Sequence, residues 1–189
     1  MMTMPTARDV AVLVGSLRGA SFTRKVVGAL AELVRDQLRL EIVEIGQLPL
    51  YNEDLEQQPP PGWVEFRARV RRADAVLFAT PEYNRSVPGG LKNAIDVGSR
   101  PYGSSVWQGK PGAIISVSPG AIGGFGANHH LRQSLVFLDV PAMQQPEAYV
   151  GRAATLFDDT GRLTNADTRD HLVKFGQAFA RWIERLSPR

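Results

Sequence analysis

Residues 75–96 read AVLFATPEYNRSVPGGLKNAID, and this stretch decides the fold. It opens with an apolar run, Ala75 to Ala79, which is typical of a strand buried in a parallel sheet. A loop with two prolines, an aromatic, a carboxylate and an amide follows. A helix then begins near Pro88, where a missing N–H costs little. Because α/β proteins hold ligands at the carboxyl ends of buried strands, this loop is a candidate binding loop.

Outward from this stretch, strand and helix patterns alternate five times along the chain. Such alternation predicts a parallel sheet with helices on both faces. We therefore expect one α/β domain over residues 1–189, a flavodoxin-like three-layer sandwich with a five-stranded parallel sheet of order 2-1-3-4-5. The expected strands are 9–14, 40–45, 75–79, 113–117 and about 148–150, and the expected helices are 23–37, 63–73, 88–97, 128–138 and 167–186.

Three unusual loops converge in that strand order. Its switch point lies between strands 1 and 3, and ligands bind there, outside the carboxyl ends of the strands. The loop at 15–23 follows the first strand, and the loop that begins at Thr80 follows the third. The glycine-rich loop at 118–124 follows the neighbouring fourth strand. The sequence therefore predicts one binding site formed by these three loops.

The first loop offers donors suited to an anion. It holds the hydroxyls of Ser16, Ser21 and Thr23, the guanidinium of Arg18, and the N–H groups of a helix start. A helix N-terminus also adds the positive end of its dipole. This set fits a monophosphate. The same residues would also suit ordinary helix capping by Ser21 or Thr23, with Arg18 solvated.

The other two loops suit a planar ring with polar edges. Tyr83 offers a flat face, and the backbone groups of Glu82 and Asn84 offer hydrogen-bond partners. In the third loop Ser118 can donate, and glycines such as Gly120 permit close approach. Ordinary proline and glycine turns would produce the same residue types, so each loop alone leaves that alternative open.

Composition narrows the classes of function. The chain has 189 residues, a net charge of +3 and no cysteine, so disulfides, thiolate metal sites and cysteine nucleophiles are excluded. The charge suits small anions and is too weak to indicate nucleic acid. The histidine spacing argues against a metal site. The polar residues 1–9 and the lack of a membrane-length apolar run predict a cytoplasmic protein without membrane contact. We expect Arg67, Arg69, Arg71 and Arg72 to form a solvated helix face.

At these residues the chain resembles the NAD(P)H-dependent FMN reductase family, and within it the bacterial quinone and chromate reductase branch. The resemblance runs over nearly the whole chain. The segment at 80–96 is its most specific part. The matching segments are Gly15-Ser-Leu-Arg18 with Ser21-Phe22, Pro49-Leu-Tyr51, Thr80-Pro-Glu-Tyr-Asn84 through Ser86 to Asp96, Gly109-Lys-Pro111, Gly123-Gly124 and His130-Leu-Arg-Gln133.

The resemblance implies a flavodoxin-like enzyme that binds FMN non-covalently and takes a hydride from NAD(P)H. It implies no catalytic side chain, because the flavin carries the chemistry. A ping-pong reaction with a small-molecule acceptor is implied: a quinone, an azo compound, chromate or free flavin. A homodimer or homotetramer with the flavin near the subunit interface is implied as well. By the resemblance Ser16, Arg18, Ser21, Phe22 and Thr23 hold the phosphate, Pro81, Glu82, Tyr83 and Asn84 line the ring, and Ser118 contributes from the third loop.

The chain departs from the family pattern in a few places. Thr23 stands where the family often has Asn, and its hydroxyl can still serve a phosphate. Gly126 stands where an arginine is common, and His129 where the branch often has Tyr. That arginine could pair with an acidic group across an interface or help to bind the dinucleotide. A flavodoxin-like electron carrier with a protein partner is the alternative function, although the basic balance of charge argues against it.

Overall fold

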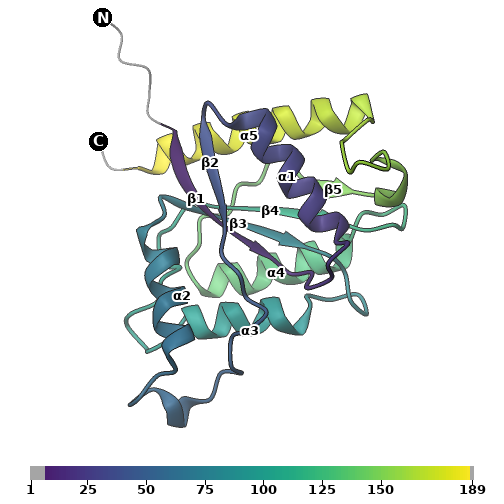
Figure 1. Ribbon diagram of the computed structural model, residues 1–189. Helices are drawn as coiled ribbons and strands as arrows, with labels where there is room; N and C mark the ends of the chain where they lie inside the picture. The colour runs from purple at the N-terminus through teal and green to yellow at the C-terminus, as the bar shows by residue number, and fades with distance from the viewer. Residues whose placement is uncertain (1–6, 188–189) are drawn as a thin grey trace, which may run out of the picture.

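A computed structural model describes residues 7–187 of the chain. A five-stranded sheet of order β2-β1-β3-β4-β5 forms the centre, and every neighbouring pair of strands is parallel, as expected (Figure 1). Residues 1–6, part of the segment that we interpreted as a polar N-terminus, lie outside the described residues. The elements are β1 (Arg8–Val14), α1 (Phe22–Val34), β2 (Leu38–Ile42), η1 (Glu53–Leu55), α2 (Pro61–Arg72), β3 (Ala75–Thr80), α3 (Gly89–Gly98), β4 (Gly112–Val117), α4 (Phe125–Phe137), β5 (Tyr149–Val150), η2 (Ala153–Thr155) and α5 (Ala166–Leu186).

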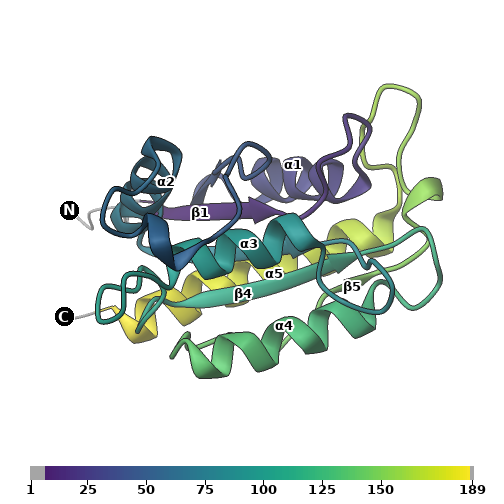
Figure 2. The ribbon, with the colours of Figure 1, turned by 90° about the horizontal axis from the view of Figure 1, so that it is seen from below.

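The sheet separates two hydrophobic cores. Side chains alternate between the faces of a strand, so Val10 and Val12 of β1 point to one core and Ala11 and Leu13 to the other. The first core is closed by α1 and α5, and the second by α2, α3 and α4. In Figure 2, α3 lies in front of the strands and α5 behind them. The two central strands β3 and β4 are buried along their whole length.

Some element ends differ from the sequence-based expectation. Strand β2 runs from Leu38 to Ile42 rather than over 40–45, because its register places Leu38 opposite Arg8 at the start of β1. Helix α4 begins at Phe125, three residues before the expected start at 128. Its N-cap is Gly124, which has a left-handed backbone and gives no side-chain cap. Sequence patterns seldom reveal a helix start of that kind. A single domain over 1–189 stays a prediction.

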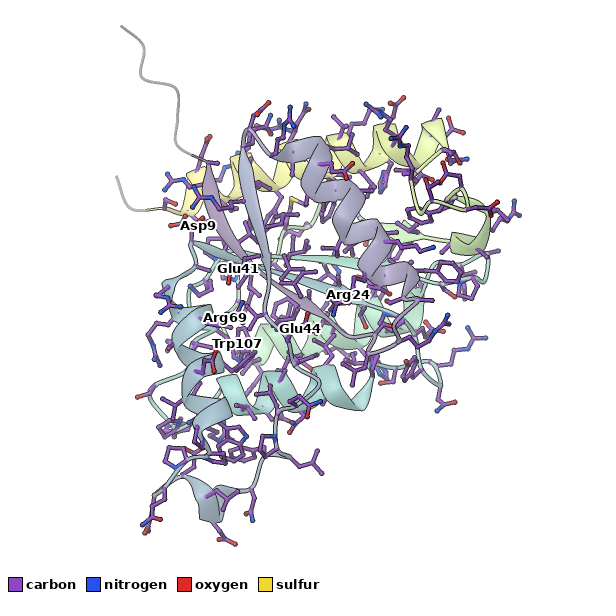
Figure 3. All side chains as sticks on the ribbon, viewed as in Figure 1. Asp9, Arg24, Glu41, Glu44, Arg69 and Trp107 are labelled. Atoms are coloured by element: carbon purple, nitrogen blue, oxygen red, sulfur yellow. The ribbon has the colours of Figure 1, made fainter. Side chains whose placement is uncertain are left out.

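The expectation for the arginine cluster was wrong at Arg67. Its side chain is 7% exposed and forms an ion pair of 2.8 Å with Glu56. Its Nε also donates to the carbonyl oxygen of Val97, and its guanidinium lies 5.4 Å from the ring centre of Trp63. Arg69 is not fully solvated either, because it forms an ion pair with Glu41 of β2 at the edge of the sheet (Figure 3). Helical spacing alone does not show that a distant loop covers one arginine of such a row.

The covering loop is the proline-rich stretch at 47–60, which lies between β2 and α2. Asn93 of α3 holds its first part, because its Oδ1 accepts from the Tyr51 N–H at 2.8 Å. Trp63 donates to the carbonyl oxygen of Pro49 at 2.9 Å. The pair of Arg67 and Glu56 holds the later part. This stretch is therefore fixed to α2 and α3 rather than free in solvent.

Candidate functional site

The loops after β1, β3 and β4 lie at one end of the sheet, where the strands end (Figure 2). The first two are in close contact at Gly15. A Cβ built on Gly15 would lie 3.1 Å from Leu91 and 3.2 Å from Pro81. The Gly15 N–H also donates to the carbonyl oxygen of Ala79 at 2.8 Å. Glycine at position 15 thus lets the loop after β1 pass directly against the loop after β3, as the strand order predicted.

The first loop buries its hydroxyls around the start of α1. Ser16, Ser21 and Thr23 are each at most 5% exposed. Ser21 is the N-cap, and its Oγ accepts from the Arg24 N–H at 3.1 Å. The N–H groups at the first two positions of the helix, Phe22 and Thr23, have no partner within it. Capping and anion binding are therefore compatible here: the helix start keeps donors even though Ser21 already caps it.

Phe22 and Arg18 lie differently from the buried hydroxyls. The Phe22 ring packs against the core beneath α1, so its backbone N–H is the group it offers to a ligand. Arg18 is exposed and folds back over the helix start. Its guanidinium lies 5.9 Å from the centre of the Phe22 ring and donates to the carbonyl oxygen of Ala20 at 3.3 Å. A positive charge thus stands beside the N-terminus of α1.

An ion pair fixes the outer side of this helix turn. Arg24 bonds Glu44 through two nitrogens, each at 2.9 Å (Figure 3). These hydrogen bonds raise the pKa of Arg24 and lower the pKa of Glu44. Since Arg24 is already paired, Arg18 is the arginine of this region whose charge faces solvent without a carboxylate partner among the described residues.

The second loop forms a tight two-residue turn. Tyr83 and Ser86 exchange backbone hydrogen bonds of 3.0 and 2.9 Å. The two residues between them, Asn84 and Arg85, have φ values of 50° and 63°. Left-handed backbone at both central positions is the pattern of a type I′ turn, which usually contains glycine. The Tyr83 N–H is used within the turn, whereas Tyr83 as a residue is 47% exposed.

Helix α4 holds this turn in place. The Glu82 Oε2 accepts from the Ala127 N–H at 3.2 Å, so the carboxylate caps the N-terminus of α4. The Ser86 hydroxyl lies 2.8 Å from His130 Nδ1. A Cβ on Gly126 would lie 2.8 Å from the Arg85 carbonyl oxygen. Local sequence patterns do not reveal these contacts, because the residues lie about forty positions apart. The sequence indicates the two-residue turn only weakly, because Asn84-Arg85 lacks the glycine that such turns usually contain.

The third loop crosses the end of β5 at very short range. Cβ atoms on Gly123 and Gly151 would lie 2.6 Å from the Tyr149 carbonyl carbon and 2.3 Å from the Ala121 carbonyl oxygen. Two glycines therefore allow the backbones to touch. Ser118 begins this loop, and its Oγ accepts from the Gly120 N–H at 3.0 Å. The Ser118 hydroxyl is partly exposed and keeps its own hydrogen to donate.

An aromatic cluster lies beside this loop. The rings of Phe125 and His129 are 4.1 Å apart, and His129 Nε2 lies 3.0 Å from the Tyr149 hydroxyl. Burial and a hydrogen bond to Glu147 raise the pKa of Tyr149 to about 12. Tyr149 therefore stays neutral at physiological pH. Its hydroxyl links α4 to β5.

A cleft of about 630 Å³ lies away from the three loops, between α1 and the turn at 160–163. Its lining carries Lys25, Arg162 and Arg169 against Glu32, but none of its residues belongs to the three loops. Among residues 7–187 no group of three or more histidine or acidic side chains could hold a metal ion. In the same range no helix is both long and apolar enough to cross a bilayer. The three loops remain the candidate site.

The donor set of these loops fits a phosphate joined to a planar ring. Buried hydroxyls, the start of α1 and Arg18 provide the phosphate side. Tyr83, on the adjacent rigid turn, provides an exposed aromatic face. Gly15 brings the two halves within contact distance. FMN has this form, and no residue of the three loops conflicts with it.

Comparison with known proteins agrees with this geometry. The sequence profile of the family described as NADPH-dependent FMN reductase matches residues 8–155. A quinone reductase of Pseudomonas putida is 65% identical over 182 residues, which cover 96% of this chain and 97% of that protein. A 2-hydroxy-1,4-benzoquinone reductase of a Burkholderia species is 45% identical over 177 residues, which cover 94% and 97% of the two chains.

A solved structure shares the fold over almost the whole chain. FerB of Paracoccus denitrificans, a flavoenzyme NAD(P)H:(acceptor) oxidoreductase, superposes with a TM-score of 0.90 at 42% identity. The match covers 95% of this chain and 98% of FerB. The relatives are enzymes, so the comparisons support the oxidoreductase interpretation and not the electron-carrier alternative.

Proposed function

The chain belongs to the NADPH-dependent FMN reductase family, and from that premise we propose that it reduces quinones with electrons from NAD(P)H. The family and the relatives indicate an NAD(P)H-dependent FMN enzyme. One observation carries the choice of acceptor: a quinone reductase is 65% identical over nearly the full length of both chains. Chromate, azo compounds and free flavin stay predictions as further acceptors, and a cytoplasmic location stays a prediction as well.

The first loop is proposed to bind the FMN phosphate. The buried hydroxyls of Ser16, Ser21 and Thr23 and the Phe22 N–H surround the start of α1, where an anion is favoured. Arg18 adds a full positive charge beside it. These groups hold the cofactor by charge and by hydrogen bonds, without a covalent bond.

The second and third loops are proposed to orient the flavin ring. Pro81 lies against Gly15, next to the phosphate loop, and Tyr83 presents its exposed ring from the turn. Glu82 and Asn84 offer backbone groups, and Ser118 offers its hydroxyl. The Glu82 carboxylate caps α4, so it is not available as an acid or base. FMN, when bound, supplies the two-electron redox chemistry. No side chain of the three loops is assigned a catalytic step.

The same open rim is proposed to receive both substrates in turn. The Tyr83 side of the site is exposed, and no described segment covers it as a lid. We expect the oxidised dinucleotide to leave before the acceptor binds, which is a ping-pong order. Initial rates with varied NADPH and benzoquinone should then give parallel double-reciprocal lines. Intersecting lines would contradict a shared rim.

A homodimer or homotetramer is proposed on the basis of helix α4. Val136 and Phe137 near its end are each 81% exposed, and Phe125 at its start is 50% exposed. Ile122, just before the helix, is 57% exposed. Large apolar side chains gathered on one element favour contact with another protein surface. A second copy of this chain is the proposed partner.

The activity is tested with purified protein supplied with FMN. We expect a yellow protein that oxidises NAD(P)H, followed at 340 nm, when benzoquinone is added. A protein that binds no FMN and oxidises no NAD(P)H would contradict the proposal.

The phosphate site is tested with Arg18→Gln. We expect FMN affinity to fall on the order of tenfold, because one charged contact is lost. The matched control is Arg35→Gln at the other end of α1. The Arg35 side chain is 81% exposed, and its ion pair with Asp36 is long, at 3.9 Å. Equal FMN affinity in both variants would contradict the assignment of Arg18.

A further inference from the structure

The three loops of the site carry two positive side chains, Arg18 and Arg85. Arg18 stands at the start of α1, where the proposed function places the flavin phosphate. The dinucleotide brings at least two further phosphate groups to the open rim of the same site. Those phosphates also need a positive partner. Arg85 is the remaining cation of these loops.

The Arg85 charge is available to a ligand. Its side chain is 77% exposed, and its nearest carboxylate oxygen belongs to Glu82 at 3.4 Å, which is long for an ion pair. That carboxylate is also shared, because its other oxygen accepts from the Ala127 N–H. Glu82 is thus partly neutralised by the N-terminus of α4. The guanidinium keeps most of its donors free for an anion in solvent.

The backbone that carries Arg85 is fixed. The turn is closed by the Tyr83–Ser86 hydrogen bonds and held to α4 through Glu82 and through His130. Arg85 itself has a left-handed backbone, with a φ of 63°. Its carbonyl oxygen would lie 2.8 Å from a Cβ at position 126, so glycine there lets the turn sit on α4. The arginine is therefore displayed from a rigid support, two residues from Tyr83.

We propose that Arg85 binds a phosphate of NAD(P)H and so sets the affinity for the reducing dinucleotide. This inference rests on the proposed function, and it names a residue outside the set proposed to hold FMN. The position of Gly126 adds to the argument. Gly126 leaves α4 without a side chain at this place, and the Arg85 turn occupies the space beside it. The positive charge at the open rim of the site therefore comes from Arg85 in the turn rather than from a side chain of α4.

The test compares Arg85→Gln with the wild-type holoenzyme. Calorimetric titration with NADP⁺ and with NAD⁺, which do not reduce the flavin, gives dissociation constants independent of turnover. We expect Arg85→Gln to weaken NADP⁺ binding on the order of tenfold, the effect of one lost charged hydrogen bond. In stopped-flow reduction by NADPH, the apparent dissociation constant should rise far more than the limiting rate falls. An equal loss with NAD⁺ assigns Arg85 to the diphosphate, and a loss with NADP⁺ alone assigns it to the 2′-phosphate.

Two further variants keep the test decisive. Arg72→Gln removes the same charge from the end of α2, just before β3 begins and so at the end of the sheet opposite the three loops. It should leave both dissociation constants unchanged. Arg85→Lys keeps the charge and should recover most of the affinity even if glutamine disturbs the turn. The inference is overturned if Arg85→Gln binds both dinucleotides within twofold of Arg72→Gln. Absence of any NADPH oxidation by the wild type would instead overturn the proposed function.

Discussion

At the scale of single residues, glycines decide how closely the loops of the site approach one another. Gly15 brings the first loop to Pro81, and Gly126 lets the turn that carries Arg85 rest on α4. Gly28, in the middle of α1, differs from both, because a Cβ there would meet nothing within 4 Å. The space around each glycine therefore predicts the sign of an alanine substitution.

Gly126→Ala is expected to destabilise the protein. Alanine favours a helix by about 1 kcal/mol over glycine, but its Cβ would lie 2.8 Å from the Arg85 carbonyl oxygen. Overpacking against backbone costs about 1–3 kcal/mol, which exceeds the helix gain, so we expect a net loss of up to about 2 kcal/mol in the free energy of unfolding. Urea denaturation measures it. FMN affinity should fall too, because the Tyr83 turn must shift.

The matched control for that variant is Gly28→Ala. It adds the same methyl group to a helix in open space, so we expect a gain of about 1 kcal/mol in the free energy of unfolding. FMN affinity should not change. If both variants gain stability, the contact between Arg85 and Gly126 does not restrain the turn.

The sequence predicted the residues of the three loops as a candidate site, but not the contacts that hold these loops together. Ser16, Ser21 and Thr23 could be predicted, since a strand end, a cap residue and a helix pattern are all local signals. The contact of Glu82 with Ala127 joins loops about forty residues apart. Local pattern carries no information on such a pair. Capping from a distance also explains why the start of α4 was expected at 128 rather than at Phe125.

At the scale of elements, one buried ion pair connects the stretch at 47–60 to α2 and α3. Arg67→Ala leaves the Glu56 carboxylate, now 15% exposed, without its partner and removes the hydrogen bond to Val97. Loss of one member of a buried pair costs about 3–5 kcal/mol, and we expect about 3 kcal/mol here. Chemical denaturation measures this loss. Limited proteolysis should show faster cleavage within 47–60.

The control for this effect is Arg72→Ala on the exposed end of the same helix. We expect a change within about 0.5 kcal/mol, as for other surface substitutions. Equal stability of the two variants would mean that the ion pair does not anchor the stretch. The sequence could not separate these arginines, because the loop that buries Arg67 comes before the helix and has no periodic pattern.

A second element-scale prediction concerns pH and the packing of α5. Burial lowers the pKa of His171 below its usual 6.5, although a hydrogen bond with the backbone of Glu147 opposes the shift. The unfolded chain therefore binds a proton at this residue more readily than the folded chain does. The stabilisation is complete above pH 6.5 and is lost as the pH falls below that value. Urea denaturation at pH 7.5 and 5.5 should show lower stability at pH 5.5.

His171→Gln is expected to reduce this loss on acidification, because the titrating group is gone. His129 and His130 remain in the variant and serve as an internal control. An unchanged difference in stability between pH 7.5 and 5.5 would show that another group is responsible.

At the scale of the whole molecule, the strand order could be predicted because it follows from alternation and handedness. Five strand-helix repeats allow few arrangements, and the observed order β2-β1-β3-β4-β5 is the expected one. That order places three loops at one end of the sheet, which is why a candidate site was predicted there. Strand order does not predict which apolar side chains the outer surface exposes. Helix α4 was expected as a helix, but its exposed apolar residues become evident only in the fold.

The exposed apolar face of helix α4 leads to a prediction about the assembly of the protein. Phe125 and Val136 lie three turns apart and share a face, and Phe137 extends it. Val136 and Phe137 expose 81% of their surfaces, so burying them against a second copy is favourable. We expect sedimentation to show a dimer or tetramer, and Phe137→Asp to shift it toward monomer because a charge would then be buried. Tyr102→Asp is the control, since Tyr102 is 91% exposed in the loop before β4. A monomeric wild type, or equal assembly of both variants, would show that this face is not the subunit contact.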